Sequence, residues 1–460
     1  MFSKLILAMG AADAAAIKGT NIGGWMVLEP WISPSLFYQF LNNHKEDGVG
    51  MDSWTFCEAL GPEAGNQAMR AHWENFYTED HIKGLADRGV QMVRLPVGDW
   101  TLKPYGPYVG CMDGAEDYIQ WMFDTCAKYN IEILLDVHAM KDSQNGFDNS
   151  GKTTSLIWDE GGYNFTHWPD NHAEWMGPWV DGKMDHINYA NLQWALDVSE
   201  GLLQRWGSHS AFKAFEPVNE PWWETDMDIL KDFYRQVRKM VQRYAPQAHF
   251  VFHNSFRYDN NQWNDLFRDD DIDKVAMDHH YYQAFNNPAF TTVQASCDDY
   301  ESNASYAAQF KYEVWFGEWA LATDVCAMWL GGFNDGNTQP QAECQRIDCP
   351  ATYLPLDIFP NATVDASIES NGPYGYGIDG DSSFYTIQNG KCTKDSAAFS
   401  DEDVAAIAKC ALTSFDKYLE RTFMWTAHNE LEERWSYTRS WDMGWINPAN
   451  WTTSATETDL

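Results

Sequence analysis

Two acidic motifs at the ends of apolar runs contain the residues best suited to chemistry. Asn219-Glu220-Pro221 follows the apolar run 212–218, and Gly317-Glu318-Trp319 follows a second run at 312–316. Proline cannot donate to a strand ladder, so the first strand is predicted to end there and to present Glu220 at its end. Two opposed carboxyl groups are the equipment of glycoside hydrolysis: one protonates the leaving oxygen, while the other attacks the anomeric carbon or activates water. Glu220 and Glu318 are therefore the candidate catalytic residues.

Other polar and aromatic side chains also stand at or just after the ends of apolar runs: Arg94, His138, Asn219, His280, Tyr282 and Trp425. An arginine opposite Glu318 would hold that carboxyl ionised and nucleophilic, and a tyrosine hydroxyl would do the same by hydrogen bonding. The amide of Asn219 suits a sugar 2-OH, a contact that strengthens as charge develops. We expect these side chains to surround the two carboxyls.

Eight short apolar segments, mostly alternating with segments of helical periodicity, indicate a series of β/α units. The predicted strands are 16–22, 90–97, 131–137, 212–218, 248–253, 274–277, 312–316 and 423–425, and the predicted helices are 66–88, 115–129, 188–206, 226–244, 303–311 and 402–419. This order predicts an α/β fold, a parallel sheet closed as a (β/α)8 TIM barrel, with an open doubly wound sheet as the alternative. The polar residues favour the barrel, because the carboxyl ends of its strands meet at one mouth.

The chain is predicted to consist of a leader and one domain with an insertion. Residues 1–16 place Lys4 before a short apolar run and small residues, which is typical of a signal peptide. Residues 17–460 form a single (β/α)8 catalytic domain. The stretch 331–400 is rich in Gly, Pro, Asn, Asp and Cys and has no periodicity, so it is expected to be a long insertion before the last strand. No later run reaches about 18 apolar residues, so no membrane span is expected.

Cysteines and glycosylation motifs agree with secretion. The nine cysteines, with no CxxC pair and no zinc-ligand spacing, stand at 57, 111, 126, 297, 326, 344, 349, 392 and 410. In an oxidising compartment they allow up to four disulfides and leave at least one thiol free. The four N-glycosylation motifs begin at Asn164, Asn303, Asn361 and Asn450. The expected location is extracellular or in a cell wall.

Composition restricts the class of partner. The formal net charge of −36 repels nucleic acid, anionic lipid and acidic polysaccharides. An aromatic content of 15%, with 23 tryptophans, suits the uncharged faces of sugars. A neutral polysaccharide or oligosaccharide is therefore the expected partner.

A resemblance to a known family rests on separated motifs that occur in the same order. Gly23-Gly24-Trp25, Leu28-Glu29-Pro30-Trp31, the loop 143–151, Asn219-Glu220-Pro221, the run 278–283 and Gly317-Glu318-Trp319 resemble glycoside hydrolase family 5. The sequence is most similar to the fungal-type exo-β-1,3-glucanases, over about residues 18–330 and 421–447. It departs from them at Ala139–Asp142, at Trp222-Trp223, at Gly331 and in the insertion, all of which border the predicted mouth.

The resemblance implies a retaining (β/α)8 hydrolase, and no cofactor or metal is expected. Glu220 matches the general acid/base and Glu318 the nucleophile, and Arg94, His138, Asn219, His280, Tyr282 and Trp425 match the surrounding substrate contacts. Glu29 and Asp148 match residues that hold a terminal glucose, and Phe147 and Phe285 match an aromatic pair at the pocket entrance.

The leading hypothesis is a secreted, monomeric β-glucosidase-type hydrolase, an exo-1,3-β-glucanase that releases glucose by double displacement. The alternatives are a β-glucan transglycosylase, a β-1,4- or β-1,6-glucan hydrolase on the same site, and a non-catalytic glucan-binding wall protein. His279 and His280 together suggest a metal, but neighbouring strand residues face opposite ways and the sequence offers no evident third ligand. Linkage, exo or endo action, disulfide pairing and the role of Trp222 and Trp223 stay open at this level.

Overall fold

The structure, a computed structural model, describes residues 17–41, 48–154, 157–159, 164–166, 171–286, 288–330, 344–364, 387 and 390–450. The predicted signal peptide at 1–16 and large parts of the insertion lie outside the described residues.

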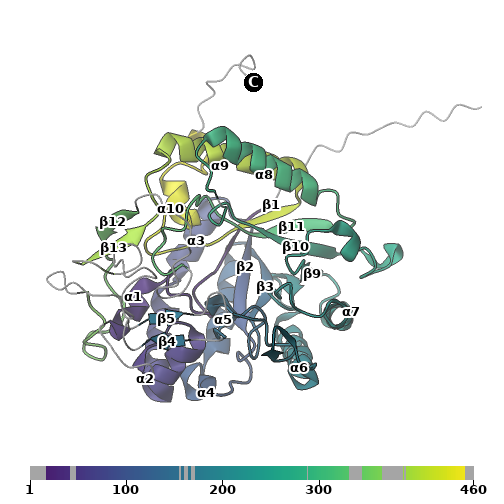
Figure 1. The fold of residues 1–460 in the computed structure, drawn as a ribbon, viewed down its shortest axis with the longest axis horizontal. Coiled ribbons are helices and arrows are strands. Elements are labelled where there is room, and N and C mark those ends of the chain that lie inside the picture. Colours follow the sequence, from purple (N-terminus) through teal and green to yellow (C-terminus); the bar gives the residue numbers. More distant parts are fainter. Residues whose placement is uncertain are drawn as a thin grey trace, which may run out of the picture.

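Eight parallel strands close into a barrel, in the order β1-β14-β11-β10-β9-β8-β3-β2 (Figure 1). They are β1 Ile17–Asn21, β2 Met92–Gly98, β3 Glu132–Ala139, β8 Phe212–Glu216, β9 His249–His253, β10 Val275–Tyr281, β11 Glu313–Trp319 and β14 Arg421–Met424. Each coincides with one of the eight predicted strands, and the open-sheet alternative is wrong because β1 pairs with both β2 and β14. The TIM-barrel prediction is confirmed.

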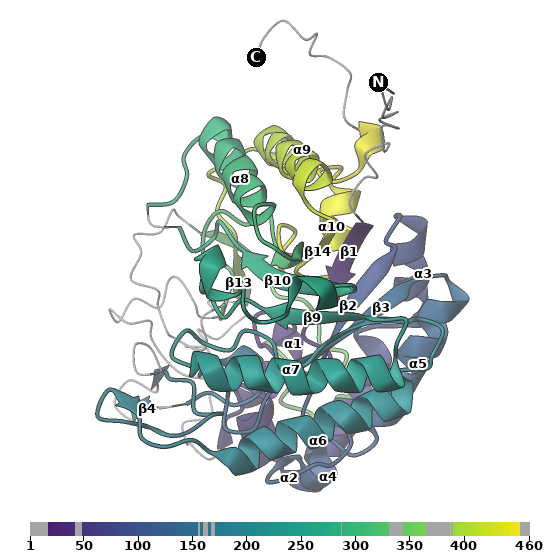
Figure 2. The same ribbon diagram turned by 90° about the vertical axis from the view of Figure 1, so that its right-hand side faces the viewer.

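Helices surround the barrel, and in Figure 2 α6 and α7 lie next to each other on one side of it. The α-helices are α1 Pro34–Phe37, α2 Ser53–Asn75, α3 Glu79–Asp87, α4 Tyr108–Cys111, α5 Ala115–Lys128, α6 Tyr189–Trp206, α7 Met227–Tyr244, α8 Val293–Ala307, α9 Asp401–Tyr418 and α10 Tyr437–Asp442. The short 3₁₀ turns are Tyr38–Phe40, Asp148–Ser150, Asn260–Gln262, Asp269–Asp271 and Pro448–Asn450.

Two helix predictions were wrong in extent. The single helix predicted at 66–88 is two helices, because Thr78 caps a new one by accepting the N–H of His81. The helix predicted at 303–311 is α8, which begins at Val293 after the cap Thr292. Its buried face consists of Ser296, Tyr300, Ala304 and Ala307, and such small and polar residues leave little apolar periodicity to detect.

The interior of the barrel is a packed layer with one side chain from each of seven strands: Met92, Leu134, Ala214, Val251, Ala276, Trp315 and Phe423. All seven are fully buried, so the barrel is closed by side chains below its mouth.

The insertion contains regular structure, which corrects the expectation of a purely irregular stretch. Within the described residues, β12 Gln345–Asp348 pairs antiparallel with β13 Lys391–Lys394. The disulfides Cys326–Cys344 and Cys349–Cys392 fasten this hairpin. Two further disulfides, Cys57–Cys111 and Cys297–Cys410, bring the total to four and leave Cys126 as a buried free thiol. Cys297–Cys410 joins α8 to α9, which lie side by side in Figures 1 and 2.

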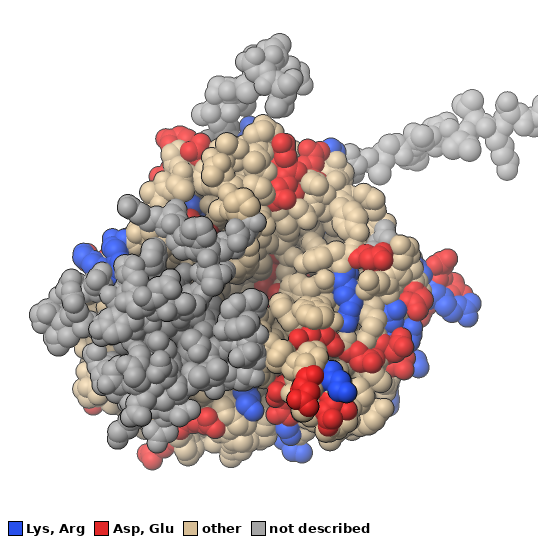
Figure 3. Space-filling model, in the orientation of Figure 1, with Lys and Arg blue, Asp and Glu red and all other residues tan. Residues whose placement is uncertain are grey.

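Short antiparallel pairs complete the fold: β4 Ile157–Asp159 with β5 Asn164–Thr166, and β6 Trp179–Val180 with β7 Lys183–Met184. Acidic and basic side chains interleave on the surface around α6 and α7 (Figure 3), where Arg235 pairs with Asp232 at 2.8 Å. None of the described helices is long and apolar enough to cross a membrane.

Candidate active site

The carboxyl ends of the strands bring both predicted glutamates to the mouth of the barrel. Glu318 lies within β11 and is 4% exposed. Glu220 follows β8 by four residues and adopts φ 45°, a left-handed backbone conformation that turns the chain at the end of the strand. The strand stops at Glu216, two residues earlier than the predicted run, because residues 217–221 already form the turn.

Arg94 connects the site from below. It is fully buried, and its Nη1 donates to Glu318 Oε1 at 2.9 Å while its Nη2 donates to Asn219 Oδ1 at 2.7 Å. It also contacts the buried carboxylates of Glu216 at 2.9 Å and Asp136 at 3.1 Å, and its Nη1 donates to Asn21 Oδ1 at 3.2 Å. A guanidinium is always charged and has five fixed donors, so it orients Glu318 and Asn219 at once.

The second oxygen of Glu318 accepts a hydrogen bond from the Tyr282 hydroxyl at 2.6 Å. Burial raises the pKa of Glu318, and the charge of Glu220 adds to this, while His280 and Arg94 oppose it without cancelling it. Arg94 acts on Glu318 in the expected direction, since its charge favours the ionised carboxylate. Arg94 limits a rise that burial causes.

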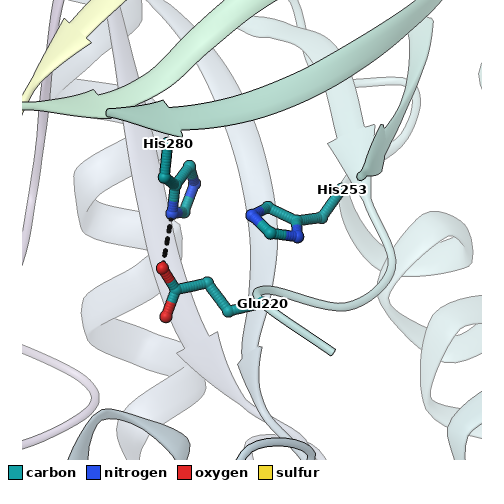
Figure 4. Close-up of side chains that lie close together, drawn as sticks. All are labelled: Glu220, His253 and His280. Carbon is teal, nitrogen blue, oxygen red and sulfur yellow. Dashed lines mark hydrogen bonds and ion pairs between the residues drawn. The ribbon is translucent and has the colours of Figure 1, made fainter. Parts of the chain in front are cut away.

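Glu220 is held between two side chains. Its Oε1 lies 2.8 Å from Nδ1 of His280 (Figure 4), and its Oε2 accepts from the amide of Asn149 at 3.0 Å. The same His280 nitrogen lies 3.3 Å from Glu318 Oε2. The two glutamate oxygens are therefore at most 6.1 Å apart, the sum of the 2.8 and 3.3 Å distances.

His280 and Glu220 share one proton. Nε2 of His280 faces the Asp278 carboxylate at 3.0 Å, so it must be the donor there. Nδ1 then either donates to ionised Glu220 or accepts from protonated Glu220. Burial alone would raise the pKa of Glu220, but His280, with added contributions from His253 and His138, outweighs it and lowers that pKa to about 2. Burial would lower the pKa of His280, but Glu318, Asp278 and Glu220 raise it well above 6.5. The proton therefore lies on His280 when no substrate is bound.

His138 and Trp425 form one wall of the mouth. Their rings stack at 5.2 Å with an interplanar angle of 10°. Nδ1 of His138 donates to Asp136 at 2.6 Å, which leaves Nε2 to accept from the Asn219 amide at 3.4 Å. This chain fixes the orientation of Asn219, with its oxygen on Arg94 and its nitrogen on His138.

Two more acidic residues, Glu29 and Asp148, lie near the central glutamates on other loops. Glu29 is 4% exposed, and its Oε2 accepts from the indole of Trp31 at 3.1 Å. Its Oε1 has no hydrogen-bond partner among the described residues. Burial raises the pKa of Glu29 well above 4.5, and the charges of Asp148, Glu318 and Glu220 add to it. Glu29 thus lies within electrostatic range of Asp148 and of both central glutamates.

The two predicted entrance phenylalanines stand in different surroundings. Phe147 packs edge-to-face on Trp222 at 5.3 Å. Phe285 is 48% exposed and packs on Tyr282 at 6.0 Å. Every predicted site residue is thus at the mouth or on a loop beside it.

Comparison with known proteins identifies the family. The family profile "Cellulase (glycosyl hydrolase family 5)" matches residues 57–328. The chain belongs to glycosyl hydrolase family 5. It is 32% identical over 330 residues to a glucan 1,3-beta-glucosidase of Pichia angusta, covering 70% of this chain and 67% of that protein. It is 30% identical over 375 residues to a glucan 1,3-beta-glucosidase of Blumeria graminis, covering 76% and 79% respectively.

The fold is also that of a solved structure, a rutinosidase from Aspergillus niger. The TM-score is 0.59 at 17% identity, covering 95% of this chain and 99% of the rutinosidase. Together with the barrel, family membership makes the protein a glycoside hydrolase.

In this family 5 hydrolase the structure adds residues that the sequence did not reveal: Asn21, Asp136, Asn149, Glu216, His253 and Asp278. Asp136 and Asp278 each stand two residues before a predicted site histidine. Side chains on a strand alternate, so these acids face the same side as His138 and His280. A charged residue within an otherwise apolar strand was the available signal.

Glu220, His253 and His280 offer ligand atoms that all lie within 4.8 Å of one another, which is donor chemistry suited to a transition metal. Figure 4 shows the ring of His253 pointing toward the other two. However, the N–H of Ser255 donates to Nδ1 of His253 at 3.0 Å, so Nε2 of His253 carries its proton. Both ring nitrogens of His280 are already hydrogen-bonded, to Glu220 and to Asp278. The observed hydrogen bonds therefore fit a proton between His280 and Glu220 rather than a metal ion. His279 faces away and bonds Asn254 at 2.9 Å.

The Trp222-Trp223 pair divides between two environments. Trp222 is half-buried between Phe147 and Phe256, with ring distances of 5.3 and 5.1 Å. Trp223 is 56% exposed. Trp222 therefore packs against other aromatic rings, and Trp223 is the more exposed of the two.

Proposed function

We propose that the protein is a secreted exo-1,3-β-glucanase that releases glucose from β-glucan by double displacement. The observation that carries the mechanism is the upper limit of 6.1 Å between oxygens of Glu220 and Glu318. Retaining glycosidases place their carboxyls roughly 5–5.5 Å apart, whereas inverting ones need about 6.5–9.5 Å to admit a water. Relatives named glucan 1,3-beta-glucosidase support the substrate.

In the first step Glu318 attacks the anomeric carbon, and the glycosidic C–O bond breaks. Glu220 gives its proton to the departing oxygen, and a covalent glycosyl ester forms on Glu318. Arg94 and Tyr282 hold one oxygen of Glu318 each, so the carboxylate is already oriented before attack.

In the second step Glu220, now ionised, takes a proton from a water that attacks the same carbon. The ester bond breaks, glucose leaves with its original anomeric configuration, and Glu318 is free again. Interception of the ester by a sugar hydroxyl instead of water would give transglycosylation.

His280 supplies the proton that Glu220 lacks in the free enzyme. The Glu318 charge is foremost among the contributions that raise the pKa of His280. As Glu318 forms the ester this charge disappears, the pKa of His280 falls, and the shared proton moves to Glu220 and on to the leaving oxygen. Nucleophilic attack and proton donation are thereby coupled through one imidazole.

Glu29, Asp148 and the Trp425 ring are proposed to hold the terminal glucose. The unpartnered Oε1 of Glu29 is suited to a sugar hydroxyl, since a buried polar atom without a partner is costly. A carboxyl pair that closes the pocket beyond the cleavage point would limit entry to chain ends and so favour exo action. Phe147 and Phe285 would contact the sugars outside the pocket.

The experiment combines trapping of the covalent intermediate with analysis of the reaction products. A 2-deoxy-2-fluoroglucoside with an activated leaving group should form a covalent adduct on Glu318, located by peptide mass spectrometry. The Glu318→Gln variant should form no adduct and cleave no aryl β-glucoside, while Asp357→Asn, an exposed carboxylate in the insertion, should behave as wild type.

A time course on β-1,3-, β-1,4- and β-1,6-glucans then tests the substrate. Glucose alone from the first time point on the β-1,3-glucan is expected. A ladder of oligomers would contradict exo action, faster release from another linkage would change the substrate, and binding without turnover would make the protein a glucan-binding protein.

A further inference from the structure

Away from the catalytic centre, three carboxyl groups are buried together where the insertion meets the barrel. Asp324 follows β11, Asp395 follows β13, and Glu432 lies in the loop after β14. They are 7%, 3% and 0% exposed respectively. None of them is used by the proposed mechanism.

Positive charge near this acidic cluster (Asp324, Asp395 and Glu432) is scarce. The only guanidinium near it among the described residues is Arg434, whose Nη1 lies 4.0 Å from Asp324, while its Nη2 donates to two backbone carbonyls. Lys394 is already paired with Glu433 at 2.7 Å. Asp324 has its own donor in the Ser396 hydroxyl at 2.7 Å. Asp395 and Glu432 are thus left without a cation of their own.

The Asp395 side chain has no N–H or hydroxyl donor: both of its carboxylate oxygens are buried, and neither accepts from such a group among the described residues. Its neighbour within hydrogen-bonding reach is the Glu432 carboxyl. Both oxygens of Glu432 accept the backbone N–H of Asp395, at 3.0 and 3.2 Å, so the two residues lie against each other. The hydroxyl of Thr393, fully buried and two residues before Asp395, also has no partner in the described part of the chain. Residues 393 and 395 fall on the same side of an extended segment.

These orphan oxygens need a positive partner. A buried, unpaired carboxylate is too costly to persist without a proton or a cation. One proton between Asp395 and Glu432 would satisfy a single oxygen of Asp395 and leave the other oxygen and Thr393 unpaired. A divalent cation can be bound by all of these oxygens together.

We propose that Asp395 and Glu432, with the Thr393 hydroxyl, bind a calcium ion. The donors are all hard oxygens, which suit calcium or magnesium rather than zinc or copper. The proposed ligands come from two chain segments, residues 393–395 and the loop that contains Glu432. Such a site favours calcium, because magnesium demands near-ideal octahedral geometry.

Such an ion would tie the insertion hairpin to the pocket wall. Glu432 is three residues from Trp435, whose ring packs on Tyr282 at 5.2 Å. Tyr282 donates to Glu318, so the ion would stabilise the segment behind the proposed nucleophile. The disulfides Cys326–Cys344 and Cys349–Cys392 hold the same region covalently.

The test is calcium binding and thermal unfolding of full-length protein stripped with EDTA. At pH 8, millimolar calcium should raise the melting temperature by several degrees, whereas equal magnesium should do much less. Equilibrium dialysis should find one tightly bound calcium per chain. Asp395→Asn should abolish both effects, and the surface control Asp357→Asn should retain them.

The rival explanation is that a proton alone, and no calcium ion, neutralises Asp395 and Glu432. The two explanations predict a different dependence of thermal stability on pH. Burial, with the charges of Glu433 and Asp324, raises the pKa of Glu432 from 4.5 to about 8. The folded protein would then hold a proton that the unfolded chain releases, so stability would fall as the pH rises from 4.5 to 8. Calcium competes with that proton, and its stabilising effect should be larger at pH 8 than at pH 5. A melting temperature that falls over this range without responding to calcium, or no bound calcium in wild-type protein, would overturn the proposal.

Discussion

Replacement of His280 by asparagine tests the shared proton. The asparagine amide nitrogen occupies the place of Nδ1 and can still donate a hydrogen bond to Glu220. However, an amide does not titrate, so it cannot accept and release a proton. In the wild type, His280, together with His253 and His138, lowers the pKa of Glu220 from 4.5 to about 2, against the effect of burial. This difference corresponds to about 3 kcal/mol. Without the imidazole, burial dominates and the pKa of Glu220 should rise above 4.5.

The measured quantity is the pH dependence of kcat/KM on an aryl β-glucoside. In the wild type the alkaline limb reports loss of the proton shared by His280 and Glu220, and the pKa of His280 lies well above 6.5. In His280→Asn the proton is on Glu220 alone, so the alkaline limb should move to lower pH by about one unit or more. Activity at neutral pH should fall by roughly 10²–10⁴, the usual contribution of a general acid. A substrate whose leaving group needs no protonation should lose much less.

The matched control is His279→Asn, at the neighbouring histidine that faces away and bonds Asn254. Its pH profile should keep the wild-type alkaline limb. If His280→Asn lowers activity equally at every pH with the limb unmoved, His280 merely supports the structure and the coupled proton transfer is refuted.

Three further outcomes follow from the site and the disulfides. Tyr282→Phe removes the hydroxyl that donates to Glu318 at 2.6 Å, so the pKa of this carboxyl should rise further. The acidic limb of the pH profile of kcat/KM should then move up by about one pH unit, and an unmoved limb would contradict this. Arg94→Met leaves several buried carboxylates without their cation, so the free energy of unfolding measured in urea should fall by about 3–5 kcal/mol. A variant as stable as the wild type would show instead that those carboxyls are protonated. The double variant Cys297→Ala/Cys410→Ala should lose about 2–4 kcal/mol in the same assay while retaining kcat, because this bond joins α8 to α9 outside the site.

The sequence predicted the barrel because the eight strands are short, apolar and separated by turns, a local pattern that needs no tertiary information. It placed α8 wrongly because that helix buries Ser296, Ala304 and Ala307, which do not register as an apolar stripe. The hairpin of the insertion was also missed: residues such as Lys391 and Lys394 are polar, and two disulfides hold it.

For the site, strand-end positions brought out both glutamates, Arg94 and both site histidines. What sequence could not give is the state of their protons. That state depends on distances such as the 3.0 Å between His280 and Asp278, which only the closed barrel determines. The same is true of Asn149, whose contact with Glu220 joins two segments 71 residues apart.

Two carboxyls at most 6.1 Å apart in a buried mouth cannot both be ionised unless positive charge stands beside them. Arg94 supplies one permanent charge on the side of Glu318, and His280 supplies a removable one between the pair. Asp278 makes the second charge possible, since it accepts from Nε2 and leaves Nδ1 for the glutamates. The fixed charge is therefore placed where the mechanism needs a nucleophile that stays ionised, and the removable charge is placed where it needs a proton that can leave.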